Sequence, residues 1–189
     1  IRKKNPNRLK KINRAARMIF LNKTCFNGIY RVNSKGFFNV PFGDMKNAKL
    51  YAQKNLIGCQ KRLSNTTILS SDYKKLLRRI KQDDFVYLDP PYIPISDTSH
   101  FTSYTKEGFG FKEQKELSNF CRKIDAKGAK FLLSNSHTKI INELFEKEFE
   151  RKEGTATVKF KIKKEKAKRS LAAKSSSRAP VYECIIMNY

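Results

Sequence analysis

From about Thr66 onward, short apolar runs alternate with segments of helical spacing, and this alternation limits the possible folds more than any other feature of the chain. The runs Thr67–Leu69, Phe85–Leu88, Ala129–Leu133 and Val181–Met187 predict strands. Strand–helix alternation with short connections predicts an α/β domain with a mostly parallel sheet. In such a sheet, ligands bind at the carboxyl ends of the strands.

The segments between these runs predict helices: Tyr73–Ile80, a second with inner positions from Leu117 to Ile124, and a third that starts at Thr138. Two stretches break the order. Ile93–Gly110 is rich in Ser, Thr and Gly and long enough to predict a functional loop. Lys159–Lys174 is a basic insertion, which we expect to be a mobile, solvated arm.

The first 65 residues have a different pattern of residue types. Asn5-Pro6 predicts the start of an amphipathic helix, whose polar face carries basic residues including Arg17. Asn27–Gly43 mixes turn residues with aromatics and predicts a loop or hairpin. Asn47–Leu63 predicts another helix, with Leu50, Leu56 and Leu63 inside. We therefore expect a small helical subdomain over residues 1–65 and an α/β domain over residues 66–189.

The charge of the chain indicates a polyanionic partner. Forty-one Lys and Arg stand against seventeen Asp and Glu, which gives a net charge of +24 and a pI near 10.0. Nucleic acid is a better candidate than a membrane, because the basic residues run through the whole chain and do not line one amphipathic helix. A lysine-rich composition without functional meaning stays open as the alternative.

Cysteine and histidine usage predicts no metal site. The four cysteines form no CxxC pair, and the two histidines lack nearby partners. There is no signal peptide and no apolar run long enough to span a membrane. We expect an intracellular, cytoplasmic protein with reduced thiols and no membrane partner.

The string Asp89-Pro90-Pro91-Tyr92 follows the predicted strand Phe85–Leu88 directly. By chance, this tetrapeptide should occur in such a chain with a probability on the order of one in a thousand. Two prolines fix the backbone, so that carbonyls and the tyrosine ring project in defined directions at a strand end. A rigid turn after a core strand is the structural alternative.

These residue types suit chemistry on the exocyclic amine of adenine, whose lone pair is delocalised into the ring. Asp89 and the carbonyl of the adjacent proline can accept both amine hydrogens and favour a localised lone pair that attacks a methyl sulfonium. Tyr92 can stack on the base. To reach such a pocket the base must leave the duplex, which predicts base flipping.

With this motif the chain resembles the DNA adenine N6-methyltransferases, and within them the GATC-specific Dam-type enzymes. The resemblance runs from about Lys11 to Tyr189. Beyond the tetrapeptide, it rests on several strings in family order, which are Phe26-Asn27-Gly28-Ile29-Tyr30-Arg31-Val32-Asn33, Phe38-Asn39-Val40-Pro41-Phe42-Gly43, Phe101-Thr102-Ser103-Tyr104, Leu133-Ser134-Asn135-Ser136 and Asn188-Tyr189.

The resemblance implies a partial Rossmann-like class I methyltransferase sheet with a small helical target-recognition subdomain. It implies that Phe26 wedges into the duplex and that Pro41 packs on a thymine methyl group. Arg31 is the candidate for reading guanine, because a guanidinium can meet O6 and N7 together; a phosphate contact is the alternative. The other implied DNA contacts are Asn27, Ile29, Asn33, Ser96, Thr98, Tyr104 and Arg178.

The implied cofactor is S-adenosylmethionine. Asp72-Tyr73 resembles the acidic–aromatic pair that binds its adenine, and Asp89 suits its cationic sulfonium. Asp72 could instead cap the following helix. The family also has a glycine-rich Phe-x-Gly-x-Gly turn, which does not occur in this sequence. We therefore expect a fragment, a split product or a sequence without its upstream segment.

The sequence thus predicts a site-specific DNA adenine methyltransferase that binds duplex DNA and modifies GATC. An upstream chain segment or a cognate restriction endonuclease is an additional candidate partner. The alternative function is a catalytically silent DNA-binding remnant. A ribosomal or RNA-packaging protein is a third reading, and it rests on charge alone.

Overall fold

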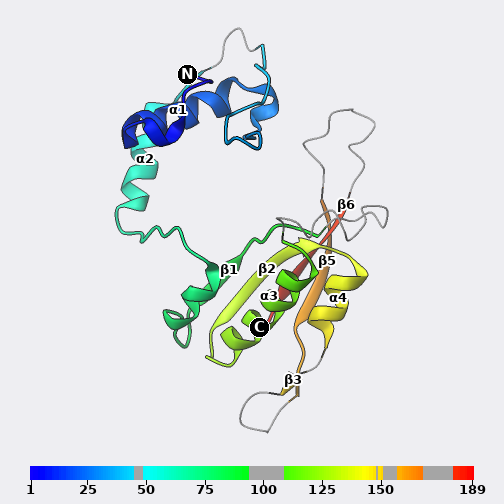
Figure 1. Ribbon diagram of the computed structural model, residues 1–189. Coiled ribbons are helices and arrows are strands. Elements are labelled where there is room, and N and C mark those ends of the chain that lie inside the picture. Colours follow the sequence, from blue (N-terminus) through cyan, green and yellow to red (C-terminus); the bar gives the residue numbers. More distant parts are fainter. Residues whose placement is uncertain (45–48, 94–108, 148, 151–156, 168–180) are drawn as a thin grey trace. The chain divides into compact units, whose positions relative to one another are not determined.

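The computed structural model describes residues 1–44, 49–93, 109–147, 149–150, 157–167 and 181–189. The chain divides into two compact units, Ile1–Leu69 and Ser70–Tyr189 (Figure 1). Each unit contains its own cluster of buried apolar side chains.

The first unit begins with a short 3-10 helix, η1 (Pro6–Arg8), which Asn5 caps by accepting a hydrogen bond from the Asn7 amide at 2.9 Å. The α-helix α1 (Lys11–Thr24) starts only after Leu9, whose extended backbone interrupts the helical path. The helix predicted from Asn5-Pro6 therefore exists, but it begins later than its proline suggests.

The core of this unit is small and consists of Leu21, Cys25, Phe38 and Val40. Arg17 was expected on the basic, solvated face of α1, but it is buried. Its guanidinium donates to the carbonyls of Ile1 and Arg2, both at 3.1 Å. These bonds satisfy the guanidinium away from water, which is why the charge can be buried here.

The predicted hairpin after α1 is confirmed by two antiparallel bridges, Cys25 with Phe42 and Val32 with Phe38. The following helix α2 (Gln53–Leu63) buries none of its residues. Leu50, Leu56 and Leu63, expected inside, are 40 %, 44 % and 48 % exposed. Leu50 and Leu56 border an apolar hollow of about 590 Å³ beside α1, so they meet open space and not a packed core.

The second unit is built on a four-stranded sheet of order β1-β2-β6-β5. Its strands are β1 (Phe85–Leu88), β2 (Lys130–Ser136), β5 (Lys161–Ala167) and β6 (Val181–Met187). β1 and β2 are parallel, whereas β2–β6 and β6–β5 are antiparallel. The α/β class is confirmed, but the mostly parallel sheet is wrong for the strands described.

The parallel prediction depended on strand–helix alternation, and that alternation stops after α4 (Lys139–Glu146). The next elements are two short strands, β3 (Phe149–Glu150) and β4 (Thr157–Val158), which pair antiparallel. Strands that follow each other without a crossover helix pair antiparallel. The sheet is therefore mixed.

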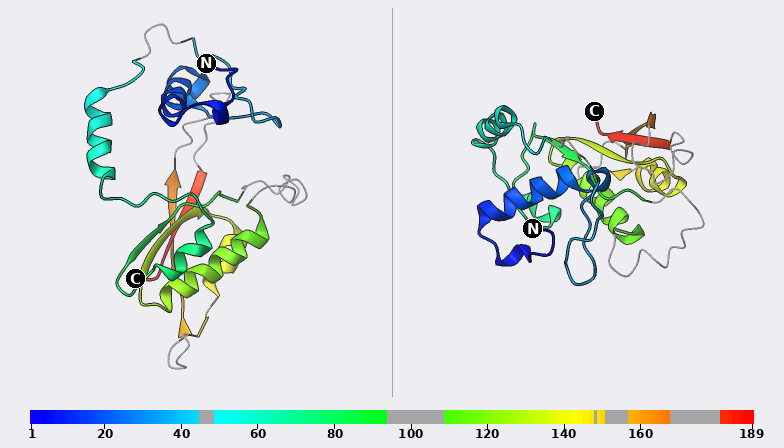
Figure 2. Two further views of the ribbon diagram at one scale, coloured as in Figure 1. Left: turned by 60° about the vertical axis from the view of Figure 1, so that its left-hand side comes forward. Right: turned by 90° about the horizontal axis from the view of Figure 1, so that it is seen from above.

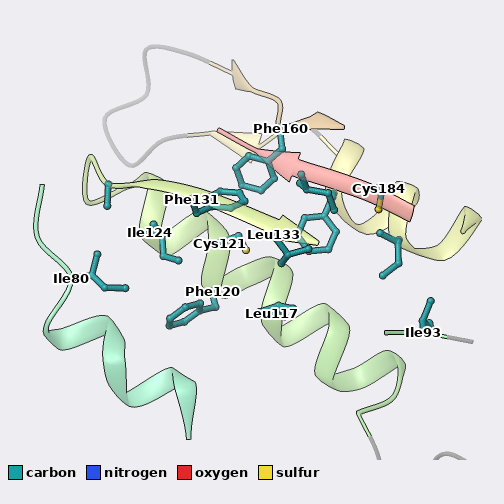
Figure 3. Close-up of a cluster of buried hydrophobic side chains, with 14 residues drawn as sticks. Ile80, Ile93, Leu117, Phe120, Cys121, Ile124, Phe131, Leu133, Phe160 and Cys184 are labelled. Carbon is teal, nitrogen blue, oxygen red and sulfur yellow. The ribbon is translucent and has the colours of Figure 1, made fainter. Parts of the chain in front are cut away.

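α3 (Phe111–Asp125) and α4 contribute to one buried cluster with the inner residues of the sheet (Figure 1; Figure 2, left). Phe131 of β2 is fully buried and meets the ring of Phe160 edge-on at 4.9 Å. Figure 3 shows this core, with Ile93 at one end of it. The segment that follows β1 is thus anchored in the core by Ile93, which is 7 % exposed.

Two further expectations, for segments on either side of the boundary between the units, differ from the structure. Thr67–Leu69 forms no strand: no partner strand is described for it, Ile68 is 72 % exposed and Leu69 is 48 % exposed. A segment of three residues without a neighbouring strand cannot satisfy its backbone by pairing. The predicted helix Tyr73–Ile80 is a 3-10 helix, η3 (Tyr73–Arg78).

The basic insertion 159–174 was expected to be a solvated arm, yet Lys161–Ala167 forms the edge strand β5. Ile162 packs against the buried cluster, while Lys161, Lys163, Lys164 and Lys166 are exposed. Lysines are compatible with an edge strand because they remain in water and discourage further strand pairing. Residues 168–174 lie outside the described ranges.

Candidate active site

The candidate catalytic motif lies where the sequence predicts it, at the carboxyl end of β1. The parallel register pairs Leu88 with Leu133, so Asp89 and Ser134 come next on adjacent strands. The Ser134 hydroxyl donates a hydrogen bond to Asp89 Oδ1 at 3.2 Å. Asp89 is itself exposed. A carboxylate held at one oxygen still offers its remaining lone pairs to a ligand.

Tyr92 is half-buried near the same serine. Burial raises the pKa of Tyr92 above its usual value, and a hydrogen bond with the Ser134 side chain opposes this rise. The phenol is neutral at physiological pH. Ser134 therefore contacts both candidate catalytic side chains, whereas the sequence analysis quotes it within a family string but gives it no role.

Two buried amides lie behind the motif. Sequence analysis did not single out Gln114, and it quoted Asn135 only within a family string, without a role. Gln114 of α3 donates from Nε2 to the Pro91 carbonyl at 3.1 Å. Asn135 of β2 donates from Nδ2 to Gln114 Oε1 at 3.0 Å. The signal was present: helical and strand spacing place Gln114 and Asn135 on the same inner faces as Leu117 and Leu133.

Asp72 and Tyr73 stand at the start of η3. Asp72 accepts a hydrogen bond from the Lys74 amide at 2.8 Å, so it makes the helix cap that the sequence left open as its alternative role. The Tyr73 ring meets Phe120 edge-on at 5.0 Å. Its hydroxyl is buried and has no hydrogen-bond partner among the residues described. Burial raises the pKa of Tyr73.

In the first unit, the candidate wedge residue Phe26 begins a tight turn, η2 (Phe26–Gly28), directly after α1. Asn27 has φ 53° and Gly28 has φ 65°, both in the left-handed region that Asn and Gly tolerate best. The turn is held against the returning chain, because the Phe26 amide donates a hydrogen bond to the Pro41 carbonyl at 2.9 Å. Phe26 is 48 % exposed and Ile29 is 38 % exposed, so apolar surface projects from this turn.

Arg31, the candidate guanine reader, is exposed on the hairpin. Its Nε donates to Asn39 Oδ1 at 2.9 Å, which orients the guanidinium. The predicted contact Asn33 has a structural task, since its Oδ1 accepts from the amides of Lys35 and Phe37, both at 3.0 Å. Pro41 is exposed beside these residues.

The remaining predicted DNA contacts, Ser96, Thr98, Tyr104 and Arg178, lie outside the described residues, as does most of the predicted loop. Within the ranges that the structure covers, no three His, Cys, Asp or Glu side chains are grouped as metal ligands would be. Over the same ranges, every helix is too short or too polar to cross a bilayer.

Comparison with known proteins matches the sequence of this chain to a family. Residues 1–171 match the D12 class N6 adenine-specific DNA methyltransferases. The chain is 45 % identical over 187 residues to the type II methyltransferase M.MjaIII of Methanocaldococcus jannaschii, a match that covers 98 % of this chain and 61 % of the relative.

Two other relatives agree. The type II methyltransferase M1.LlaDCHI of Lactococcus lactis subsp. cremoris is 40 % identical over 96 % of this chain and 61 % of its own. A DNA adenine methylase of Vibrio cholerae is 33 % identical over 70 % of this chain and 48 % of its own. The chain therefore spans about three fifths of the length of the two type II methyltransferases, and it belongs to the D12 class N6 adenine-specific DNA methyltransferases.

Proposed function

We propose that this chain supplies the DNA-reading and catalytic parts of an enzyme that transfers a methyl group from S-adenosylmethionine to N6 of adenine in GATC. The observation that carries the proposal is the Asp89-Pro90-Pro91-Tyr92 motif at the end of β1, where Ser134 contacts both Asp89 and Tyr92. Ligands bind at such strand ends in α/β proteins.

Each group of the motif has a task in this proposal. Asp89 accepts one hydrogen of the adenine amine, and the Pro90 carbonyl accepts the other. The Pro91 carbonyl is already bonded to Gln114, which favours Pro90 for that role. Tyr92 stacks on the flipped base. Acceptors aimed at the amine favour the lone pair needed for attack, and this stabilisation grows as positive charge develops on nitrogen.

Asp89, Asp72 and Tyr73 are the residues of this chain that would hold the cofactor, which when bound supplies an electrophilic methyl group. The unpartnered hydroxyl of Tyr73 supports this assignment, because a buried polar atom without a partner is costly unless a ligand satisfies it. The exposed Asp89 carboxylate suits a sulfonium cation. Asp72 caps η3 with Oδ1, while Oδ2 lies 3.9 Å from Lys74.

Duplex DNA is the proposed substrate, and we assign its reading to the first unit. Phe26 and Ile29 offer exposed apolar surface, and Arg31 a guanidinium oriented by Asn39. Two relatives are named type II methyltransferases. That the chain acts beside a cognate restriction endonuclease remains a prediction.

Calorimetric titration with S-adenosylmethionine, with and without a GATC duplex, tests the proposal. It is combined with tritiated methyl incorporation into that duplex and into one that lacks GATC. We expect cofactor binding and incorporation specific for GATC. Because the family's glycine turn does not occur in these 189 residues, we expect the rate to rise when a segment carrying the turn is supplied, fused or in trans. Tight DNA binding without cofactor binding or transfer in either form would favour the silent remnant.

A further inference from the structure

The strongest feature outside the site itself is the pair of buried amides behind it. Gln114 and Asn135 are both 0 % exposed, and they come from different elements, α3 and β2. They are joined to each other and also to the backbone on both sides of Tyr92. Burying two primary amides is costly unless their hydrogen bonds are satisfied, so their arrangement needs an explanation.

The bonds form one directed chain. Asn135 Oδ1 accepts from the Ile93 amide at 3.3 Å and from the Ser136 amide at 2.8 Å. Its Nδ2 group is therefore left to donate to Gln114 Oε1 at 3.0 Å, and Gln114 Nε2 in turn donates to the Pro91 carbonyl at 3.1 Å. Turning either amide over would place donors against donors or acceptors against acceptors. The contacts are thus consistent with one orientation of both side chains.

The consequence concerns Tyr92 directly. The carbonyl of the residue before it and the amide of the residue after it are both fixed by this chain of bonds. The Ile93 side chain is anchored in the core, whereas Asp89 and Tyr92 meet Ser134 on the other side of the segment. Since side chains in a strand alternate between faces, Asn135 and Ser134 support the motif from opposite faces of β2.

We propose that Gln114 and Asn135 are positioning residues, which hold the Pro91 carbonyl and the Ile93 amide so that Asp89 and Tyr92 keep the geometry for the adenine amine. The inference rests on the proposed function for its effect on catalysis, although the hydrogen-bond relay itself does not. Neither amide is assigned contact with the base or the cofactor. Their effect on transfer is expected to come through Tyr92 and the Pro90 carbonyl.

The test uses the full chain with two substitutions at one position. Gln114→Met keeps the length of the side chain but removes both bonds. Gln114→Glu, measured at a pH where the new carboxyl is ionised, keeps the acceptor for Asn135 but loses the donor to Pro91. Ser118→Ala is the matched control, because Ser118 is also 0 % exposed on α3 but donates to the Leu144 carbonyl, away from the motif. The three variants are compared for kcat and KM of methyl transfer, thermal stability, and exchange of the Ile93 amide hydrogen by NMR.

We expect both Gln114 variants to lower kcat by up to about 100-fold with KM for DNA within about twofold, since a small misplacement can cost that much. In Gln114→Met, the Ile93 amide should exchange about tenfold faster, as expected for one weakened hydrogen bond. Ser118→Ala should lose stability without either change. The proposal is overturned if Gln114→Met matches Ser118→Ala in either kcat or Ile93 exchange.

The exchange measurement separates this inference from the proposed function. If the unsubstituted chain transfers no methyl group even with the glycine-turn segment supplied, the enzymatic proposal fails. Ile93 exchange in Gln114→Met then still decides whether the relay holds the segment. Unchanged exchange in that variant would reject the relay, whatever the activity.

Discussion

The two units of this protein place their charge and their apolar residues in opposite ways. Ile1–Leu69 contains sixteen Lys and Arg and a single acidic residue, Asp44, whereas Ser70–Tyr189 contains twenty-five and sixteen. Among the residues that the structure describes, the buried cluster of the first unit has four apolar members and that of the second has fourteen. A short chain with few buried residues gains little stability from its core. The first unit therefore exposes most of its basic residues and several aromatic side chains, whereas the second buries more of its apolar residues in a packed core.

This difference fits a division of labour. In the proposed function the first unit contacts duplex DNA, and such contact needs positive charge and exposed side chains. Chemistry on one amine instead needs groups held in place before the substrate arrives. Substitutions in the two units should therefore have different effects on binding, stability and transfer.

The largest effect is expected from Asp89→Ala, which removes the charged acceptor for the adenine amine. Methyl transfer should fall by about 1,000-fold or more, because an acceptor aimed at developing charge is lost. Affinity for the GATC duplex should change by less than about threefold, since DNA reading is assigned to the first unit. Single-turnover transfer and fluorescence anisotropy measure the two quantities. Glu146→Ala, at an exposed carboxylate on α4, is the control and should leave both unchanged.

The second prediction concerns stability and compares one phenylalanine from each unit. Phe131→Ala empties the centre of the larger core and should lower the free energy of unfolding by about 3–5 kcal/mol. Phe26→Ala, at a side chain that is 48 % exposed, should change it by about 0.5 kcal/mol or less. Denaturant unfolding followed by circular dichroism provides both values. Equal losses would mean that Phe26 belongs to a core and is not a contact residue.

A smaller effect is expected at Arg31, on the hairpin of the first unit. If its guanidinium meets a guanine, Arg31→Ala should weaken binding to GATC by about 1–3 kcal/mol more than binding to a random duplex. Arg62→Ala, at an exposed arginine of α2, should weaken both duplexes equally. Competition binding against the two duplexes measures the difference. An equal loss for Arg31→Ala would reduce Arg31 to a phosphate contact.

The smallest expected effect is a dependence of the free energy of unfolding on pH, and it arises in the second unit. Burial raises the pKa of the Cys184 thiol from 9.0 to about 11. Below pH 9 the thiol is neutral in both folded and unfolded chains. As pH rises from 9 to 11, the unfolded thiol ionises first, so the free energy of unfolding should fall, by about 1–2 kcal/mol.

Chemical denaturation at pH 8, 9, 10 and 11 measures this fall. Cys184→Ala should remove the part of this fall in the free energy of unfolding that the Cys184 thiol causes. The raised pKa of the buried Cys121 thiol acts in the same direction from pH 9 upward, and the raised pKa values of Tyr73 and Tyr92 do so only above pH 10. All three are unchanged in that variant. A fall of equal size in Cys184→Ala would mean that the thiol does not contribute.

The sequence was sufficient to predict a strand where the residues of that segment alone indicate one. The strands Phe85–Leu88 and Val181–Met187 lie at the residues predicted, because both segments are rich in aromatic and branched apolar residues that favour strands. The same reasoning placed Asp89 at a strand end. It failed for Thr67–Leu69, whose apolar run lacks a partner strand in the described chain, and for Lys161–Ala167, where pairing with β6 outweighs the lysines.

The supporting residues of the site were harder to predict, for a physical reason. Gln114 and Asn135 act through partners 23 and 42 residues away, at Pro91 and Ile93. Ser134 meets Asp89 across 45 residues. Such pairs depend on the parallel register of β1 and β2 and on the packing of α3, which periodicity within one segment cannot specify.

The most direct test of the account is the identity of the modified nucleoside. The chain, with a glycine-turn segment supplied, is incubated with S-adenosylmethionine and a GATC duplex, and the digested DNA is analysed by mass spectrometry. The account predicts N6-methyladenine at the GATC adenine, and its loss in Asp89→Ala while the duplex is still bound. Methyl groups on another base, or N6-methyladenine formed equally well by Asp89→Ala, would contradict it.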